Sequence, residues 1–189
     1  MKESSLSIHP LDVAEVETPI GPFVIEACDK GIHSMKFKNS QASCEGVPCT
    51  IFHSYDLPVR IDMKNRENDH LTDAVNWLKS YFSGKDVMKP LLCLPSDKSF
   101  TETCWTGALE HVPFGHTMSY GELAVACGKS ASHSRAVGTS MSKNPFLLLV
   151  PCHRIIRSGG ELGNYSSGGR NVKKWLIDFE ESAIRCLNQ

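Results

Sequence analysis

The spacing of apolar residues changes along this chain, and that change limits the folds that the chain can form. Within residues 13–37, apolar and polar residues alternate in short runs that turn sequences at residues 18–21 and 29–31 separate. This pattern is typical of a small antiparallel meander, and one more strand is expected around residues 59–61. From Leu71 to Phe82 the apolar positions recur with helical spacing instead. The first half therefore predicts a small antiparallel sheet with one helix.

The second half is expected to be mostly helical. A linker at residues 84–97, which holds prolines and charges, leads to helices near residues 99–111, 119–128, 132–143 and 172–187. Ser119 and Glu122 have the spacing of a capping box at a helix start. The two short helices joined by residues 127–130 predict a helix-turn-helix, and an ordinary helical hairpin is the alternative. The fold class is therefore α+β, with domains at residues 1–97 and 98–189.

Composition excludes some classes of protein. The chain has 189 residues, of which 41% are hydrophobic, so it is long enough to bury a core. No apolar run approaches the ~18 residues that cross a membrane. Residues 1–11 lack the apolar segment of a signal peptide, so we expect an intracellular protein whose eight scattered cysteines are reduced. Residues 97–189 carry 10 Lys and Arg against 8 Asp and Glu, which permits an acidic partner such as nucleic acid.

The segment Pro151-Cys152-His153-Arg154 is where the sequence points to chemistry. It follows the apolar run at residues 146–150, which predicts a buried strand that ends at the cysteine. A thiol is nucleophilic as the thiolate, and a nearby base or positive charge favours that form. Adjacent residues of a strand point to opposite sides. A Cys152–His153 pair therefore requires a turn at this point or a bridging water.

A histidine base must itself be oriented by a third group, which is typically a carboxylate or a carbonyl. The candidates here are Glu161, Asp178, Glu180 and Glu181, and spacing alone does not choose among them. A buried structural histidine is the alternative interpretation of His153.

These residues resemble the active-site signature of the O6-alkylguanine-DNA alkyltransferases, a family of direct-reversal DNA-repair proteins. Further segments match that family in the same order, namely Phe114–Tyr120, Ser134–Gly138, Asn144-Pro145, Gly163–Ser166 and Trp175-Leu176 with Glu180. The resemblance spans residues 99–185, and it extends more loosely to residues 18–21 and 28–33. It implies a ribonuclease H-like N-terminal domain and a winged-helix-like C-terminal domain that binds DNA.

The resemblance also implies a chemical role for each site residue. Cys152 would take the alkyl group from the guanine oxygen and keep it, because a thioether is not hydrolysed in the cell. Each molecule would then act once, as a methylated-DNA–protein-cysteine methyltransferase that needs no cofactor. His153 would act as a base through a water, and Glu180 would orient it. Asn144 would hydrogen-bond near the thiol, and Tyr120 would donate to the guanine as it leaves.

The same resemblance implies that a monomer binds double-stranded DNA and flips O6-alkylguanine out of the duplex, with O4-alkylthymine as a second candidate lesion. Arg135 would fill the gap in the base stack. On the helix at residues 132–143, Ala136, Val137 and Met141 would face inward, and the small, weakly basic outer face suits contacts with phosphates. The residues expected to contact DNA are Tyr120, Ser134, Arg135, Ala136, Thr139, Ser140, Lys143 and Arg154, and those expected to line the base pocket are Val150, Gly163, Asn164, Tyr165 and Ser166.

A structural zinc is expected as well. Some eukaryotic members of that family hold zinc in the N-terminal domain through two cysteines and two histidines. Cys28 and His33 have the matching spacing, His9 stands near the position of the missing upstream cysteine, and Cys93 would replace the downstream histidine. Mixed nitrogen and sulfur ligation suits structural zinc. A zinc-free domain is the alternative.

Two other functions fit part of the sequence. One is a cysteine hydrolase that uses Cys152 and His153. The other is a DNA-binding sensor that recognises alkylated bases without repairing them, although family-like proteins of that kind lack the cysteine. Repair of chromosomal DNA would place the protein in the nucleus of a eukaryote, with the cytoplasm as a further location.

Overall fold

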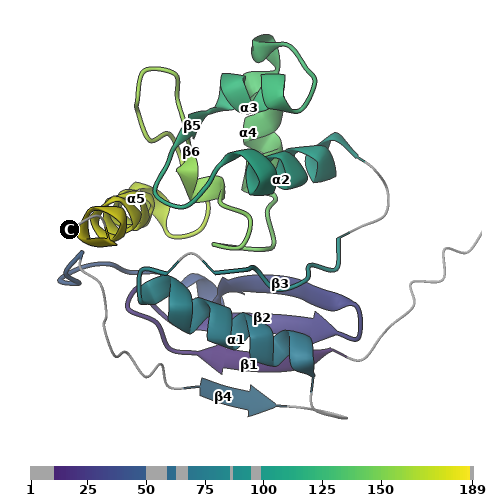
Figure 1. The fold of residues 1–189 in the computed structure, drawn as a ribbon, viewed down its shortest axis with the longest axis vertical. Helices are drawn as coiled ribbons and strands as arrows, with labels where there is room; N and C mark the ends of the chain where they lie inside the picture. The colour runs from purple at the N-terminus through teal and green to yellow at the C-terminus, as the bar shows by residue number, and fades with distance from the viewer. Residues whose placement is uncertain (1–10, 50–58, 63–67, 86, 95–98, 188–189) are drawn as a thin grey trace, which may run out of the picture.

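The first half of the chain forms an antiparallel sheet covered by one helix, as its apolar pattern predicts. The computed structural model describes residues 11–49, 59–62, 68–85, 87–94 and 99–187. Its four strands pair in the order β3-β2-β1-β4, namely β3 (Gly31–Phe37), β2 (Phe23–Cys28), β1 (Asp12–Val16) and β4 (Val59–Asp62). Helix α1 (Asp69–Phe82) lies across this sheet (Figure 1). The N-terminal part of the predicted fold is confirmed, including the strand near residues 59–61.

Local signals explain where α1 begins and ends. The side chain of Asn68 caps the helix by accepting a hydrogen bond from the Leu71 backbone N–H. Beyond Phe82 the chain turns at Gly84, whose φ of 72° lies in the left-handed region that glycine adopts readily. The apolar face of α1, which includes Leu78 and Tyr81, is buried against the rest of the core.

The second half is helical and lies on the β3 side of the sheet (Figure 1). Its elements are α2 (Phe100–His111), β5 (Met118–Ser119), α3 (Tyr120–Ala126), η2 (Ala131–His133), α4 (Ser134–Ser142), η3 (Cys152–Arg154), β6 (Ile155–Ile156) and α5 (Gly169–Leu187). The predicted capping box is present, because Ser119 and Glu122 exchange hydrogen bonds at the start of α3. Within the described residues, no helix is long and apolar enough to cross a bilayer. The boundary predicted between residues 97 and 98 lies outside the described residues.

The strand predicted at residues 146–150 is wrong, because this run forms a buried turn. Leu148 has a φ of 65°, and the Val150 N–H donates to the Phe146 carbonyl across the turn. The Asn144 side chain holds the turn from inside, since its Oδ1 accepts from the Phe146 N–H and its Nδ2 donates to the Val150 carbonyl. A short apolar run predicts burial but does not distinguish a strand from another buried conformation.

Two backbone hydrogen bonds join this turn to β3 of the sheet. The Met35 N–H donates to the Pro145 carbonyl at 2.8 Å, and the Met35 carbonyl accepts from the Leu147 N–H at 2.9 Å. Residues 91–93 bridge β3 in the same way through Ile32. The apolar core is therefore continuous from the sheet to the segment that carries Cys152.

Candidate active site

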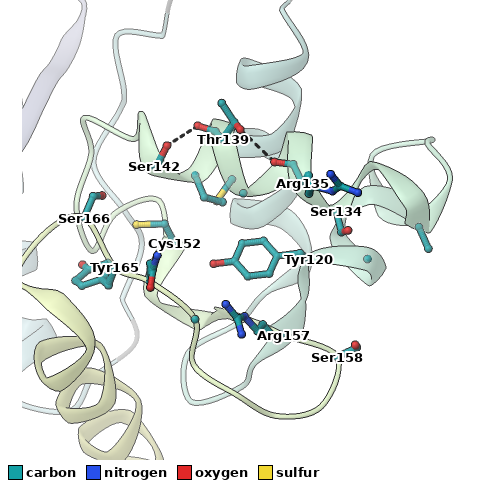
Figure 2. A pocket seen from close by; sticks show the side chains of 16 residues that line it. Tyr120, Ser134, Arg135, Thr139, Ser142, Cys152, Arg157, Ser158, Tyr165 and Ser166 are labelled. Carbon is teal, nitrogen blue, oxygen red and sulfur yellow. Dashed lines mark hydrogen bonds between the residues drawn. The ribbon is translucent and has the colours of Figure 1, made fainter.

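A cavity of about 880 Å³ opens beside Cys152 (Figure 2). Tyr120 from the start of α3 and Arg135 from α4 line one side of it, and the loop at residues 157–166 lines the other. Figure 2 shows the Tyr120 hydroxyl directed toward the Cys152 side of the cavity. The volume is large enough to admit one nucleobase together with its sugar.

Cys152 lies in a tight turn, η3, directly after Pro151. Its side chain is only 5% exposed, and it borders the cavity. The Asn144 Nδ2 donates to the Cys152 sulfur at 3.1 Å while it also holds the Val150 carbonyl. The residue that stabilises the buried turn therefore also fixes the position of the thiol.

The Cys152 thiol is protonated in the resting site. Burial raises its pKa, and the hydrogen bond from Asn144 and the positive charge of Lys173 oppose that effect without cancelling it. A protonated thiol attacks only when a base removes its proton. The site therefore needs a neutral base close to Cys152.

His153, the residue after Cys152, forms a buried pair with Glu180. The His153 Nε2 lies 2.7 Å from the Glu180 Oε1, and both side chains are almost fully buried. A carboxylate only accepts hydrogen bonds, so Nε2 carries the proton and Nδ1 carries the lone pair. Among the described residues, no side chain or backbone group hydrogen-bonds to Nδ1.

The pKa values of this pair suit general-base chemistry. Burial lowers the pKa of His153, and the negative charge of Glu180 opposes that effect only in part, so the imidazole is neutral at pH 7. Burial raises the pKa of Glu180, but the charges and hydrogen bonds of His153 and Arg154 outweigh it and hold that pKa at about 2. The carboxylate is therefore ionised and can stabilise a protonated His153.

The structure also selects among the four candidate carboxylates. Glu161 pairs with Arg157, Asp178 with Lys174, and Glu181 with Arg185, and each of these is an exposed pair of residues four positions apart. Only the Glu180 side chain, among these four, lies inside the protein against His153.

Two predicted DNA contacts are wrong, because both side chains lie inside the protein. Arg154 cannot contact DNA, because its guanidinium is buried against Glu180 and the Val112 carbonyl. Ser140 is 2% exposed, and its hydroxyl and carbonyl are bonded to Thr101 and Trp105 inside the protein. Val150 is fully buried and is not among the residues that line the cavity, and its carbonyl accepts from Asn144, so its place in the base pocket stays a prediction.

The other predicted residues face the cavity or the surface beside it. Ala136 is exposed, so the expectation that it faces inward is wrong, whereas Val137 and Met141 are buried. Lys143 is exposed at the end of α4. The predicted residues that line the cavity are Tyr120, Ser134, Arg135, Thr139, Cys152, Gly163, Asn164, Tyr165 and Ser166. Their contacts with DNA stay a prediction.

Two cationic residues near the site were missed by sequence reasoning. Arg157 lines the cavity, and its charge opposes the burial that raises the pKa of Tyr120. Lys173 is fully buried, and its Nζ donates to the Ile155 carbonyl at 2.5 Å. Burial lowers the pKa of Lys173 to about 8. The sequence did indicate that Lys173 lies near the site, because Lys173 shares a helix face with Leu176 and Glu180.

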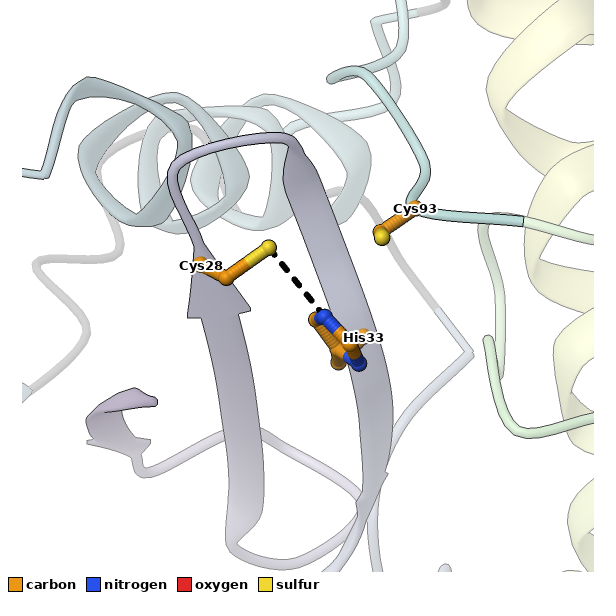
Figure 3. A group of neighbouring side chains, drawn as sticks. All are labelled: Cys28, His33 and Cys93. Carbon is orange, nitrogen blue, oxygen red and sulfur yellow. Dashed lines mark hydrogen bonds between the residues drawn. The ribbon is translucent and has the colours of Figure 1, made fainter. Parts of the chain in front are cut away.

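Three of the four predicted metal ligands lie together (Figure 3). Cys28 ends β2, His33 lies in β3, and Cys93 is placed beside them because its N–H donates to the Ile32 carbonyl. The ligand atoms of these three residues all lie within 4.8 Å of one another, and the His33 Nε2 lies 3.1 Å from the Cys28 sulfur. His9 lies outside the described residues.

Comparisons with known proteins identify both halves of the chain. Residues 14–89 match the family model described as the ribonuclease-like domain of 6-O-methylguanine DNA methyltransferase. Residues 99–182 match the model described as the DNA-binding domain of the same protein family.

Whole-length relatives agree with these matches. A methylated-DNA–protein-cysteine methyltransferase of Methanosarcina barkeri is 32% identical over 170 residues, which cover 90% of this chain and 97% of the relative. The Homo sapiens protein of that name is 31% identical, over 87% of this chain and 78% of its own. A crystal structure of Mycobacterium tuberculosis OGT in complex with DNA has a TM-score of 0.67 and 27% identity, over 89% and 92% of the two chains.

Proposed function

This chain belongs to the methylated-DNA–protein-cysteine methyltransferase family, and we propose that it repairs O6-alkylguanine in duplex DNA by moving the alkyl group onto Cys152. The observation that carries this proposal is the position of the Cys152 sulfur. It borders a cavity large enough for a nucleobase and accepts a hydrogen bond from Asn144, and the next residue along the chain, His153, is paired with Glu180. The reaction is a direct reversal of damage, and each molecule reacts once.

The transfer is an in-line displacement at the alkyl carbon. The sulfur forms a bond to that carbon while the carbon–oxygen bond to guanine breaks. The thiol proton passes to the His153 Nδ1, through a water where the two groups do not touch, and Glu180 stabilises the imidazolium. The electron pair of the broken bond goes to the guanine, whose ring accepts a proton from the Tyr120 hydroxyl. The tyrosinate then takes up a proton from water and the imidazolium releases one to water, so both side chains return to their neutral forms. The products are a neutral guanine and a thioether at Cys152.

Duplex DNA would reach the cavity over α4. Arg135 and Thr139 are exposed there and line the rim, so a base has to leave the stack to reach the thiol. Arg135 takes the place of the flipped base in the stack, and Ser134 and Lys143 contact the phosphate backbone of the DNA. Arg157 also lines the cavity and adds a second cation beside Tyr120 (Figure 2). The proposal includes O4-alkylthymine as a second substrate. The chain would bind DNA as a monomer. In a eukaryote it would act in the nucleus.

The test is to follow a labelled alkyl group from DNA. We expect a duplex with one O6-methylguanine, labelled in the methyl group, to leave its label on the Cys152 peptide with at most one methyl per chain. Peptide mass analysis and the time course of unlabelled guanine in the DNA measure this. Label released as methanol over many turnovers would support a hydrolase instead. Binding that leaves the modified base intact would support a sensor.

We also propose a structural zinc held by Cys28, His33 and Cys93. The donor set fits, because three ligand atoms of the preferred types lie close enough to bind one ion. Burial and the nearby Cys28 raise the pKa of the Cys93 thiol, and a bound zinc ion would reverse that by favouring the thiolate. A fourth ligand, His9 or water, would complete the tetrahedron. The ion would hold β2, β3 and residues 91–93 together and would take no part in alkyl transfer.

Zinc should therefore be detected in the purified protein at about one ion per chain. We expect Cys93→Ser to lower zinc content by at least tenfold and to lower the melting temperature, with little change in the rate of alkyl transfer. Elemental analysis, a zinc-release assay and thermal melting measure these effects. The matched control is Cys44→Ser, since Cys44 lies outside the cluster. Equal zinc content in the Cys93→Ser and Cys44→Ser proteins would contradict the proposal. So would the absence of zinc from the unaltered protein produced with added zinc.

A further inference from the structure

Tyr81 connects the N-terminal half of the chain to the catalytic pair. Its hydroxyl donates to the Glu180 Oε1 at 2.7 Å across 99 positions in the sequence. The same oxygen receives the His153 Nε2 at 2.7 Å and the Arg154 Nη2 at 3.1 Å. The tyrosine of α1 and the base of the active site thus share one carboxylate oxygen.

The packing around Tyr81 fixes the direction of its hydroxyl. The ring is 1% exposed and lies between Phe114 and Phe179, whose ring centroids are each 5.7 Å away. Trp77 contacts it at 5.4 Å from the preceding turn of α1. Burial and the negative charge of Glu180 raise the pKa of Tyr81 well above 10. The hydroxyl therefore remains a hydrogen-bond donor throughout the working pH range.

The second oxygen of Glu180 is also fully engaged. Its Oε2 accepts from the Arg154 Nε at 2.8 Å and from the Gly115 backbone N–H at 3.1 Å. These bonds fix the plane of the carboxylate, and Tyr81, His153 and the Arg154 Nη2 share the charge at Oε1. Each donor to that oxygen withdraws negative charge that would otherwise stabilise the imidazolium.

We propose that Tyr81 is a positioning residue for alkyl transfer, which acts through Glu180 to hold the carboxylate against His153 and to limit the basicity of that histidine. The inference rests on the proposed function and gives the N-terminal half a defined part in it. The ionisable groups that face the pair are Tyr81 from α1, Cys152 and Arg154 from η3, Lys173 from α5 and Tyr165 from the preceding loop.

The test is to remove only the hydroxyl. In Tyr81→Phe, Oε1 keeps two donors, so no buried group loses all its partners and the variant is expected to fold. With less charge withdrawn from Oε1, the pKa of His153 rises and the imidazole stays protonated to higher pH. We expect the acid limb of the single-turnover rate profile to move to higher pH by roughly half a unit. The plateau rate should fall roughly tenfold, because the carboxylate is held less firmly.

Two further variants separate this role from a purely structural one. Tyr81→Met also lacks the hydroxyl, and it should move the acid limb in the same direction even if its packing differs. Trp77→Phe changes the packing around Tyr81 without touching Glu180, so it should lower the melting temperature and leave the acid limb in place. Folded Tyr81→Phe with the unaltered pH profile and rate would overturn the proposal. So would an equal shift in Trp77→Phe.

A double variant tests the route through Glu180. In a Glu180→Gln background, Tyr81→Phe should cause no further shift of the acid limb. The reaction of Cys152 with iodoacetamide, followed by peptide mass against pH, reports on the same base without DNA. If that reaction shows the Tyr81 effect while labelled DNA gives no product, the repair function fails and the positioning role stands. If repair proceeds and Tyr81→Phe has no effect in either reaction, the positioning role fails alone.

Discussion

A Cys152→Ala protein is expected to fold and to bind duplex DNA as the unaltered chain does, but to remove no alkyl group from it. The transferred carbon bonds to sulfur, and neither His153 nor Tyr120 replaces a thiolate as the acceptor in this site. The change removes one buried sulfur atom, so the free energy of unfolding should fall by only about 1–2 kcal/mol. Loss of O6-methylguanine from a duplex, a gel-shift titration and thermal melting measure the three properties.

The comparison for this variant is Cys186→Ala, which removes an exposed thiol at the end of α5. It should transfer one alkyl group per chain at the unaltered rate. Alkyl removal by folded Cys152→Ala above the background without protein would show that another residue accepts the group. The assignment of the Cys152 sulfur as the alkyl acceptor would then be wrong.

Replacing Glu180 should have the largest combined effect on stability and activity. Glu180→Gln leaves the buried guanidinium of Arg154 without its counter-charge, a situation that costs about 3–5 kcal/mol. For a chain of this size that corresponds to a fall in melting temperature of roughly 10 °C. The variant also leaves the imidazolium of His153 unstabilised, so the single-turnover rate should fall by roughly 10²-fold or more. Thermal melting and rapid-quench assays measure both.

Glu181→Gln is the matched control, because the neighbouring Glu181 pairs with Arg185 on the surface. Such exposed pairs contribute about 0–1 kcal/mol, so this variant should be nearly unchanged. A Glu180→Gln protein that melts and reacts like Glu181→Gln would contradict the role assigned to the buried pair.

The same carboxylate gives the protein a defined acid sensitivity. The pKa of Glu180 is about 2 in the folded chain against an ordinary value of 4.5, so folding favours its ionised form. This contribution is complete above pH 4.5 and is lost as the pH falls toward 2. Glu180→Gln lacks it, so the stability difference between the two proteins should narrow as the solution is acidified through that range.

Local structure was largely predictable from this sequence, whereas contacts distant along the chain were not. The capping pair Ser119–Glu122 and the spacing of Leu71 to Phe82 predict α3 and α1, because these signals depend on near neighbours. The run at residues 146–150 was misread, since its conformation depends on the side chain of Asn144 and on the edge of β3.

The site shows the same division. Spacing left four carboxylates open as partners of His153, and the family resemblance, not the spacing, singled out Glu180. The sequence also led us to expect DNA contacts from Arg154 and Ser140, and only the packed structure shows that both point inward. Nothing in the sequence indicated the contact between Tyr81 and Glu180, because the two residues lie 99 positions apart.

The active-site turn has a second effect that concerns solubility. β3 is an outer strand of the sheet, and an outer strand with free backbone groups can pair with a strand of another molecule. Here residues 145–147 and 91–93 occupy part of that edge through Met35 and Ile32. The segment that carries Cys152 therefore also covers part of the β3 edge and so reduces aggregation through that edge. A chain cut between its halves would separate Tyr81 from Glu180 and would uncover part of the β3 edge, where strands of other copies could pair.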